Sequence, residues 1–459
     1  MNVTRSVVVA LALAVAGWPR AHAMDLMQAW QGALQHAPDA AVADAARQAG
    51  AARAQQAKAL WRPSVALEGG VAVANSETSI RGAQFSAPGF GQTGGVAFDT
   101  SVKGGAAGRY ALAVRQPVYS RERDARGRAL EIASDAAQVE WSQARQDLML
   151  RTTEAYFAAA LAGQRLQLLG RQRAAVERAA REARDRFRLG DQPVTDVHEA
   201  DAREAALQAE QLDAQTQLEQ ARATLTDLTG LVADSPLRLP DAPRIEDLAT
   251  LPAWLARADQ QSYVLKLSAA QLQAAQAQAS ATHAALSPTV DVVAQVGGEH
   301  LSGEGDFGQA SNTSRNGAIG VQLSVPLYTG GMQSAQDAEQ AALVEKARAE
   351  LERARQRIAQ QTRAAWLDLA VGQSQLKALE AALQATRLRL DATRVGRQAG
   401  DRTTQDLLNA ENDASAAELT VVAARVRLLT HRLRLASLVG ELDEAALQSV
   451  NAQLLAPDR

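Results

Sequence analysis

The histidines are the first residues to examine for acid–base or metal chemistry. The chain has six of them, at positions His22, His36, His198, His283, His300 and His431. No two have the short spacing of a metal-ligand pair on one helix. His198 has Glu199 and Asp201 nearby, but this pattern is more typical of a helix surface than of an acid–base centre. We therefore expect no catalytic residue, no metal site and no bound cofactor.

A glycine cluster and the missing cysteines narrow the chemistry further. Residues 104–108 read Gly-Gly-Ala-Ala-Gly, without the lysine and the following helix that a phosphate-binding loop requires. The chain contains no cysteine, which excludes disulfides, thiolate ligands, a cysteine nucleophile and a lipid-modified N-terminal cysteine. The sequence thus predicts a protein that is not an enzyme.

The composition indicates long helices. Among 459 residues only 4% are aromatic, while 47% are hydrophobic and many of these are alanine. A chain of this kind packs helices closely through small side chains and does not build aromatic-rich globular cores. The 48 basic and 51 acidic residues give a net charge of −3, which argues against nucleic acid as a partner.

The first 23 residues predict an export signal. Arg5 is followed by an apolar run over 7–17 and by Ala-His-Ala at 21–23, the pattern of a cleaved signal peptide. No later stretch has 18 uninterrupted apolar residues, so the sequence predicts no transmembrane helix. We expect the mature chain to be exported beyond an inner membrane.

The mature chain repeats itself. Residues 152–156, 189–191 and 229–230 each recur 210 residues later, with similar residue types. The segment 116–119 recurs at an offset of 209. An offset that stays constant over so long a stretch indicates two homologous halves.

Each half has the same predicted plan: a helix, a β-hairpin and a long helical hairpin. The linker between the halves should lie across the outside of the bundle. The C-terminal segment lacks a strong pattern and should be either a second equatorial segment of this kind or a flexible tail. The predicted boundaries are 24–230 for the first repeat (β-hairpin 63–119, tip near 190–193), 231–252 for the linker, 253–440 for the second repeat (β-hairpin 288–328, tip near 400–403) and 441–459 for the tail.

The longest elements are helices over 122–188 and 332–397, which contain no proline. Their apolar residues recur every seven positions, which is typical of left-handed coiled coils. Second helices over 194–229 and 404–439 return antiparallel to them. Each half should begin with a shorter helix, over 25–61 or 254–286.

The predicted strands carry alternating small or apolar residues and few charges. Gly/Ser/Asn/Thr-rich segments at 75–108 and 297–317 are interpreted as extracellular loops, because they combine turn residues with the largest length difference between the halves. Four strands cannot close a barrel, whereas three copies supply enough strands to enclose a lumen. The fold class is therefore mainly α with a small β part: an antiparallel coiled-coil α-helical barrel plus a transmembrane β-barrel, four strands per chain and twelve in a trimer.

The chain carries Pro-Val-Tyr and Pro-Leu-Tyr-Thr-Gly-Gly at the strand exits and Gly-Asp at both tips. With these motifs and this duplicated plan, it resembles the TolC-like family of outer-membrane channel proteins. The resemblance implies a homotrimeric exit duct in outer-membrane lipid, with a large periplasmic part. It also implies two partners, a periplasmic adaptor and an inner-membrane transporter driven by ATP (an ABC transporter) or by protons.

Three interpretations remain open at this point. The missing N-terminal cysteine slightly favours type I protein (toxin) secretion over multidrug or small-molecule efflux. A periplasmic coiled-coil adaptor that forms no pore is the alternative of another class. The charges at 178–188 fit either a solvated helix face or a surface that contacts the adaptor.

The resemblance also implies which residues close the periplasmic aperture. Arg402 matches an arginine that pairs with a Thr-Asp motif, here Thr195 and Asp196, and Asp406 matches a ring carboxylate at the constriction. Two positions depart from the family pattern, because Arg397 replaces a tyrosine and Asn409 replaces a second ring carboxylate. These departures put strong cation block and the second latch in doubt. The hairpin-tip residues expected to contact the adaptor are Gly190, Asp191, Gly400 and Asp401.

Overall fold

A computed structural model of the chain divides into two compact units. The first is mainly helical and contains residues 24–45, 140–265 and 354–454, and the second contains the sheet, within 46–139 and 266–353. The predicted signal peptide, 1–23, lies outside the described residues. The structure describes residues 24–89, 91–190, 193–233, 235–241, 243, 248–306 and 308–454.

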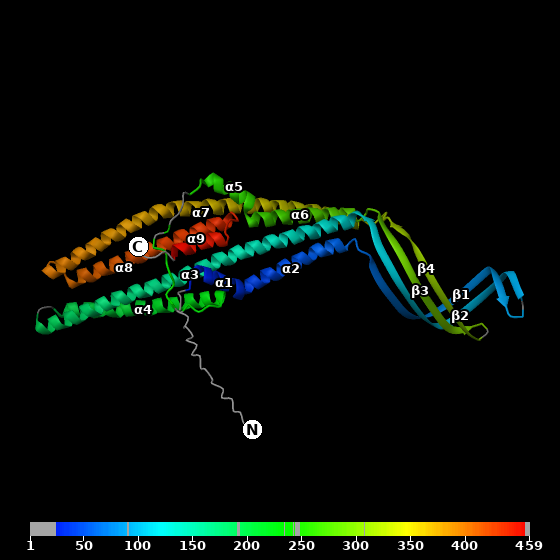
Figure 1. Cartoon of the computed structure of the whole chain (residues 1–459), viewed down its shortest axis with the longest axis horizontal. Helices are drawn as coiled ribbons and strands as arrows, with labels where there is room; N and C mark the ends of the chain where they lie inside the picture. Colours follow the sequence, from blue (N-terminus) through cyan, green and yellow to red (C-terminus); the bar gives the residue numbers. More distant parts are fainter. Residues whose placement is uncertain are drawn as a thin grey trace, which may run out of the picture. The chain divides into compact units, whose positions relative to one another are not determined.

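Two long helical hairpins make up most of the first unit (Figure 1). The first hairpin consists of α3 (Arg121–Leu189) and α4 (Val194–Thr229). The second consists of α7 (Met332–Ala399) and α8 (Thr404–Leu438). Helix α3 has 69 residues, and at about 1.5 Å per residue it extends for about 100 Å. Within the described part of the chain, no helix combines the length and the apolar character needed to cross a membrane.

The main hydrophobic core of the first unit is formed by α1 (Leu26–His36) together with parts of α3, α4 and α8 and with the C-terminal segment. Trp30 of α1 is fully buried, together with Tyr156 and Phe157 of α3. The C-terminal segment, predicted to be an equatorial segment or a flexible tail, forms α9 (Glu444–Leu454) up to the last described residue. Its apolar residues Leu447, Val450 and Leu454 recur at helical spacing and are buried in this same core.

The shorter helix predicted at the start of each half is in fact two helices. In the first half, α1 ends before Ala37, and Pro38 opens α2 (Pro38–Ala59), because proline tolerates the first helical turn but not the interior. In the second half, α5 (Leu251–Gln261) and α6 (Tyr263–Ala284) are separated by the buried Ser262.

Equivalent aromatic residues of the two halves hold the linker between them. The Tyr156 hydroxyl accepts from the Arg238 N–H (3.3 Å) and lies 3.2 Å from the Met24 carbonyl, to which it donates. Trp366, 210 residues later, donates its indole N–H to the Ala249 carbonyl (3.0 Å). Burial raises the pKa of Tyr156 to about 12. Residues 234, 242 and 244–247 of the linker lie outside the described residues.

The second unit contains one four-stranded antiparallel sheet, in the order β1-β2-β3-β4. The strands are β1 (Ser64–Ala87), β2 (Gly91–Ser120), β3 (Thr289–Gly305) and β4 (Gly308–Ser324). Pairing of β2 with β3 joins the two halves.

The interpretation of 75–108 and 297–317 as loops is wrong. In both hairpins the ladder continues to Ala87 and Gly305, close to the turn. The paired backbone groups satisfy one another whatever the side chains are, so glycine, serine and threonine remain in the strands.

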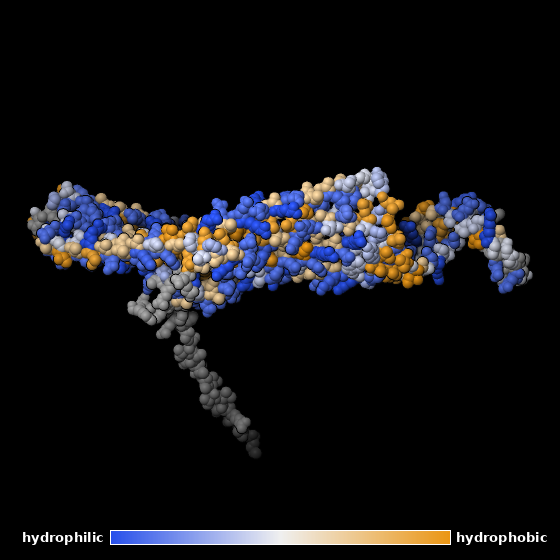
Figure 2. All heavy atoms as spheres, turned by 90° about the horizontal axis from the view of Figure 1, so that it is seen from above, coloured by the Kyte–Doolittle hydropathy of each residue, from blue (hydrophilic) through white to orange (hydrophobic). Residues whose placement is uncertain are grey.

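The two faces of this sheet differ in character. On one face Val65, Leu67 and Ile319 are 65%, 75% and 81% exposed. Figure 2 shows hydrophobic side chains gathered over the strands at the end where they join the helices. The opposite face carries charges, among them an ion pair between Arg115 and Asp291 (2.5 Å between Nη2 and Oδ2). A sheet with an exposed apolar face and a polar opposite face has the alternation of outer-membrane strands.

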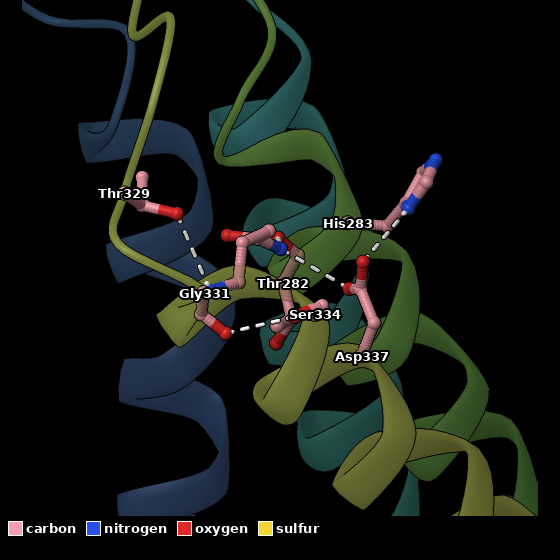
Figure 3. Close-up of polar contacts among 7 residues, drawn as sticks. Thr282, His283, Thr329, Gly331, Ser334 and Asp337 are labelled. Carbon is pink, nitrogen blue, oxygen red and sulfur yellow. Dashed lines mark hydrogen bonds and ion pairs between the residues drawn. The ribbon is translucent and has the colours of Figure 1, made fainter.

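The exit from β4 into α7 is clamped to the end of α6 (Figure 3). Gly330 and Gly331 both have positive φ, 64° and 87°, a conformation that favours glycine. The buried Gln333 then donates from Nε2 to the Thr282 carbonyl (2.6 Å) and to Asp337 (3.1 Å between Nε2 and Oδ1). The turn at the Thr-Gly-Gly motif therefore directs the chain so that the start of α7 packs against the end of α6.

Candidate functional site at the tips of the helical hairpins

The second tip begins its return helix with a reciprocal side-chain cap. The Asp406 N–H donates to Thr403 Oγ1, and the Thr403 N–H donates to Asp406 Oδ2, each at 3.0 Å. Hydrogen bonding of the Asp406 carboxylate to the Thr403 backbone N–H and side chain, with the nearby charge of Arg402, lowers the pKa of Asp406 below its usual value. The predicted ring carboxylate is thus ionised at neutral pH and also acts as a helix cap.

The first tip lacks such a cap. Pro193 occupies the cap position of α4 without a side-chain hydrogen bond. Proline has neither a hydroxyl to accept from Asp196 nor an N–H to donate to it. Thr195 is exposed and Asp196 half-buried. Asp191, one of the predicted adaptor contacts, lies outside the described residues.

Arg402 lies beside the last turn of α7. A Cβ added at Gly396 would lie only 2.9 Å from the Arg402 Cγ. Among the described residues, no hydrogen bond or ion pair joins Arg402 to Thr195 or Asp196 within one chain. The latch between them stays a prediction. Asn409, the other departure from the family pattern, accepts from Gln405 (3.4 Å).

The glycines that end the two outgoing helices have matching conformations. Gly190 and Gly400 are exposed, with φ of 81° and 87°. After Gly400, the Asp401 N–H donates to the Gly396 carbonyl (2.8 Å), which closes the end of α7. The second tip is therefore a tight turn, and the role of both tips in contacting an adaptor stays a prediction.

Arg397 connects the two hairpins. Its guanidinium forms an ion pair with Glu182 of α3, and Arg186 binds the same carboxylate (2.8 Å). Arg397 was predicted only as a substitution that weakens the second latch, and Glu182 was not singled out. The pair could not be predicted, because its two residues lie 215 positions apart on helices whose contact the sequence does not reveal.

Further contacts tie the hairpins together behind the tips. Arg171 of α3 pairs with Glu418 of α8 (3.3 Å). Leu408, next to the Asn409 position, is 7% exposed and packs in a cluster with Leu169 and Leu207 of the first hairpin. The start of α8 is therefore held by apolar packing as well as by charges.

These tips have the chemistry of a charged, adjustable contact and not of a catalytic centre. In the part of the chain that the structure describes, no group of three or more acidic or histidine side chains is arranged to hold a metal ion. His198 is exposed on α4.

The comparison with protein families decides the assignment. The model of the family described as "Outer membrane efflux protein" matches residues 29–231 and 254–441, which are the two halves without the linker. The chain belongs to the outer membrane efflux protein family.

Individual relatives agree with this assignment. The chain is 28% identical to "Outer membrane protein TolC" of Vibrio cholerae serotype O1, over 69% of this chain and 73% of that protein. It is 25% identical to "Proteases secretion protein PrtF" of Dickeya chrysanthemi, over 98% of this chain and 95% of the relative. The crystal structure of the Campylobacter jejuni CmeC outer membrane channel has the same fold, with a TM-score of 0.70 at 14% identity, covering 99% of this chain and 97% of that one.

Family membership confirms the predicted fold class, the outer-membrane location and the prediction that the protein is not an enzyme. It also argues against the pore-less adaptor, because the family consists of outer-membrane channels. TolC-family channels act with adaptor proteins and inner-membrane transporters in tripartite systems.

Proposed function

We propose that three copies of the chain form an exit duct in the outer membrane, and that this duct carries a secreted protein from an ABC transporter and its adaptor to the outside. The observation that carries the proposal is the sheet, which has one exposed apolar face and two edges, β1 and β4, that pair on one side only in the described chain.

Closure of the sheet supports the trimer. An unpaired strand edge in lipid leaves backbone groups without partners, which costs several kcal/mol for each group. Pairing β4 of one copy with β1 of the next removes both edges. Three copies of four strands make twelve, enough for a barrel with an open lumen.

Protein cargo is favoured over small-molecule efflux by one comparison. A relative that matches nearly the whole chain is named as a protease secretion protein. The efflux alternative is supported by the description of the family itself.

The tips supply the proposed aperture. The pairing of Arg397 with Glu182 holds the second hairpin against the first within a chain. Arg402, Thr195 and Asp196 would form a separate latch, between hairpins brought together in the ring. Both are charge-assisted contacts, which can be exchanged for contacts to an adaptor.

The assembly is tested with neighbouring residues on opposite faces of β4. Ile319→Lys places a charge on the apolar face, whereas Ala318→Lys places it on the polar face. We expect Ile319→Lys to reduce outer-membrane insertion strongly, because a lysine facing mid-membrane lipid costs about 2–4 kcal/mol. Ala318→Lys should still give a particle with the mass of three chains in native mass spectrometry. Equal insertion of the two variants, or a stable monomer of the unmodified chain, contradicts the proposal.

The cargo is tested in cells that lack their own duct but contain a protease-exporting ABC transporter and adaptor. We expect the chain to restore protease in the medium and to leave antibiotic sensitivity nearly unchanged. Restored antibiotic resistance without secreted protease would identify an efflux duct instead.

A further inference from the structure

The apolar face of the sheet changes character at one level of the strands. Tyr110, Gly298 and Arg315 lie opposite one another in one row across β2, β3 and β4. Gly108, His300 and Thr313 form the next row toward the hairpin turns, on the same face. The rows closer to the helices carry the exposed apolar residues Val65, Leu67, Ile319, Val321 and Leu323. On β3 and β4 polar side chains thus replace apolar ones within two residues, whereas β1 keeps the exposed Val71 and Val73 on this face.

The position of this change lies close to the outer boundary of a membrane. From Val290 to Gly298 the strand is about 26 Å long at ~3.3 Å per residue. A barrel tilt of about 35–45° reduces this to roughly 20 Å along the membrane normal, most of the apolar band of about 25 Å on outer-membrane barrels. The helices join the sheet at the opposite end of the strands. With the helices in the periplasm, the two polar rows lie at the level of the outer-leaflet headgroups.

Two glycines leave room between these polar groups. A Cβ added at Gly298 would lie 3.0 Å from the Tyr110 hydroxyl oxygen, so the phenol ring extends over Gly298 toward the strand that carries Arg315. A Cβ added at Gly108 would meet nothing within 4 Å, so this position is open. The hydroxyl of Tyr110 and the guanidinium of Arg315 therefore border an unfilled part of the face.

The imidazole of His300 is oriented by its neighbour on β4. Its Nδ1 lies 2.8 Å from Thr313 Oγ1. When the hydroxyl donates to Nδ1, the ring proton is on Nε2, which can donate to a ligand. Glu299, the acidic residue next to His300, lies on the opposite, polar face. Guanidinium, phenol and imidazole donors together are suited to a phosphate group.

We infer that Tyr110, His300, Thr313 and Arg315 form a binding site for the phosphate monoester group of a lipid in the outer leaflet. The inference rests on the proposed duct, because that assembly turns this face toward lipid. β2 and β3 are internal strands, so pairing of copies at β1 and β4 leaves Tyr110 and His300 uncovered. Arg315 contributes the fixed charge and the geometry for two parallel hydrogen bonds.

Native mass spectrometry of the full-length mature protein in detergent, titrated with lipid A as the phosphate-bearing lipid, tests the site. We expect Arg315→Gln to weaken lipid A binding about tenfold, since a hydrogen bond to a charged group contributes roughly 1.5–3 kcal/mol. The matched control is Arg109→Gln, which removes the same charge one residue from Tyr110 but on the opposite face, where Arg109 lies against Gly70. This control should bind lipid A like the unmodified protein.

Further arms identify the ligand. Phosphatidylcholine, which lacks a phosphate monoester, should bind equally to both variants and the unmodified protein. Inorganic phosphate at millimolar concentration should not displace lipid A, and efficient displacement would instead indicate a site for soluble phosphate. Equal lipid A affinities of the two arginine variants would overturn the inference. Single-channel conductance separates this failure from failure of the duct: Arg315→Gln should conduct normally, whereas no conductance from the unmodified protein would contradict the proposed function itself.

Discussion

The two hairpin tips carry the same acidic residue in different surroundings. Asp196 and Asp406 lie 210 residues apart, each at the third position of its return helix. Thr403 precedes that helix in the second tip and binds Asp406 reciprocally, whereas Pro193 precedes it in the first and, without an N–H, cannot donate to the Asp196 carboxylate. The residue at the cap position thus decides whether the carboxylate is used inside its own helix or is available to another chain.

The largest expected difference between the tips is in packing. Leu408 is buried against the first hairpin, and the equivalent position of the first half is the exposed His198. We expect Leu408→Ala to lower the free energy of unfolding by about 2–4 kcal/mol, because it leaves a cavity. His198→Ala should change it by less than about 0.5 kcal/mol. Thermal unfolding followed by circular dichroism measures both, and similar losses would mean that the tips are packed alike.

The caps give the next largest effect. Thr403→Ala should destabilise the second tip by about 1 kcal/mol, and Thr403→Ser should retain most of the cap. Pro193→Ala removes no side-chain hydrogen bond, so it should cost less. Hydrogen exchange of amides in the first turns of α4 and α8 locates the effect. Faster exchange in α4 on Thr403→Ala, with α8 unchanged, would contradict the assignment of the cap.

The helices were the most predictable part of this structure. Heptad spacing and the tip glycines Gly190 and Gly400 predicted the ends of α3, α4, α7 and α8 to within two residues, because each signal is local. The strand lengths were missed because glycine- and serine-rich sequence is also the sequence of turns. Helix α9 had a readable signal, Leu447, Val450 and Leu454 at helical spacing, but its short length hid it. The ion pair between Arg397 and Glu182 had no readable sequence signal, because it depends on which helices are neighbours in the fold.

The latch should have a smaller effect on stability than on conductance. Arg402→Ser combined with Asp196→Ala removes a solvent-exposed contact worth about 1 kcal/mol or less per subunit. Summed over symmetric copies, that bias is enough to shift an open–closed equilibrium, so we expect higher single-channel conductance in planar bilayers with assembly unchanged. Arg397→Gln should add to this effect if it acts as an independent latch. Unchanged conductance in the double variant would show that Asp196 is not a latch residue.

The smallest expected effect is on ion preference, and it depends on pH. The pKa of Asp406 is lowered, so its charge and its stabilising contribution persist from neutral pH down to its ordinary value of about 4. Both are lost as the pH falls further, through the lowered pKa. Cation preference, measured as a reversal potential, should be flat from pH 7 to about 5 and decline below about 4. Asp406→Asn should abolish this decline while keeping an oxygen that can accept from Thr403, and a decline that survives in this variant would assign it to another group.

The pairing of β2 with β3 has a consequence for how such proteins can arise. This pairing joins the first half of the chain to the second, and it is of the same antiparallel kind as the pairing proposed between β4 of one chain and β1 of the next. In the proposed ring, the β2–β3 pairing between the two halves of one chain is then equivalent to the β4–β1 pairing between two chains. Six copies of a chain that corresponds to one half would pair the same strand edges as three copies of the duplicated chain. Duplication would have left the ring unchanged while freeing each half to diverge, as the two tips have done.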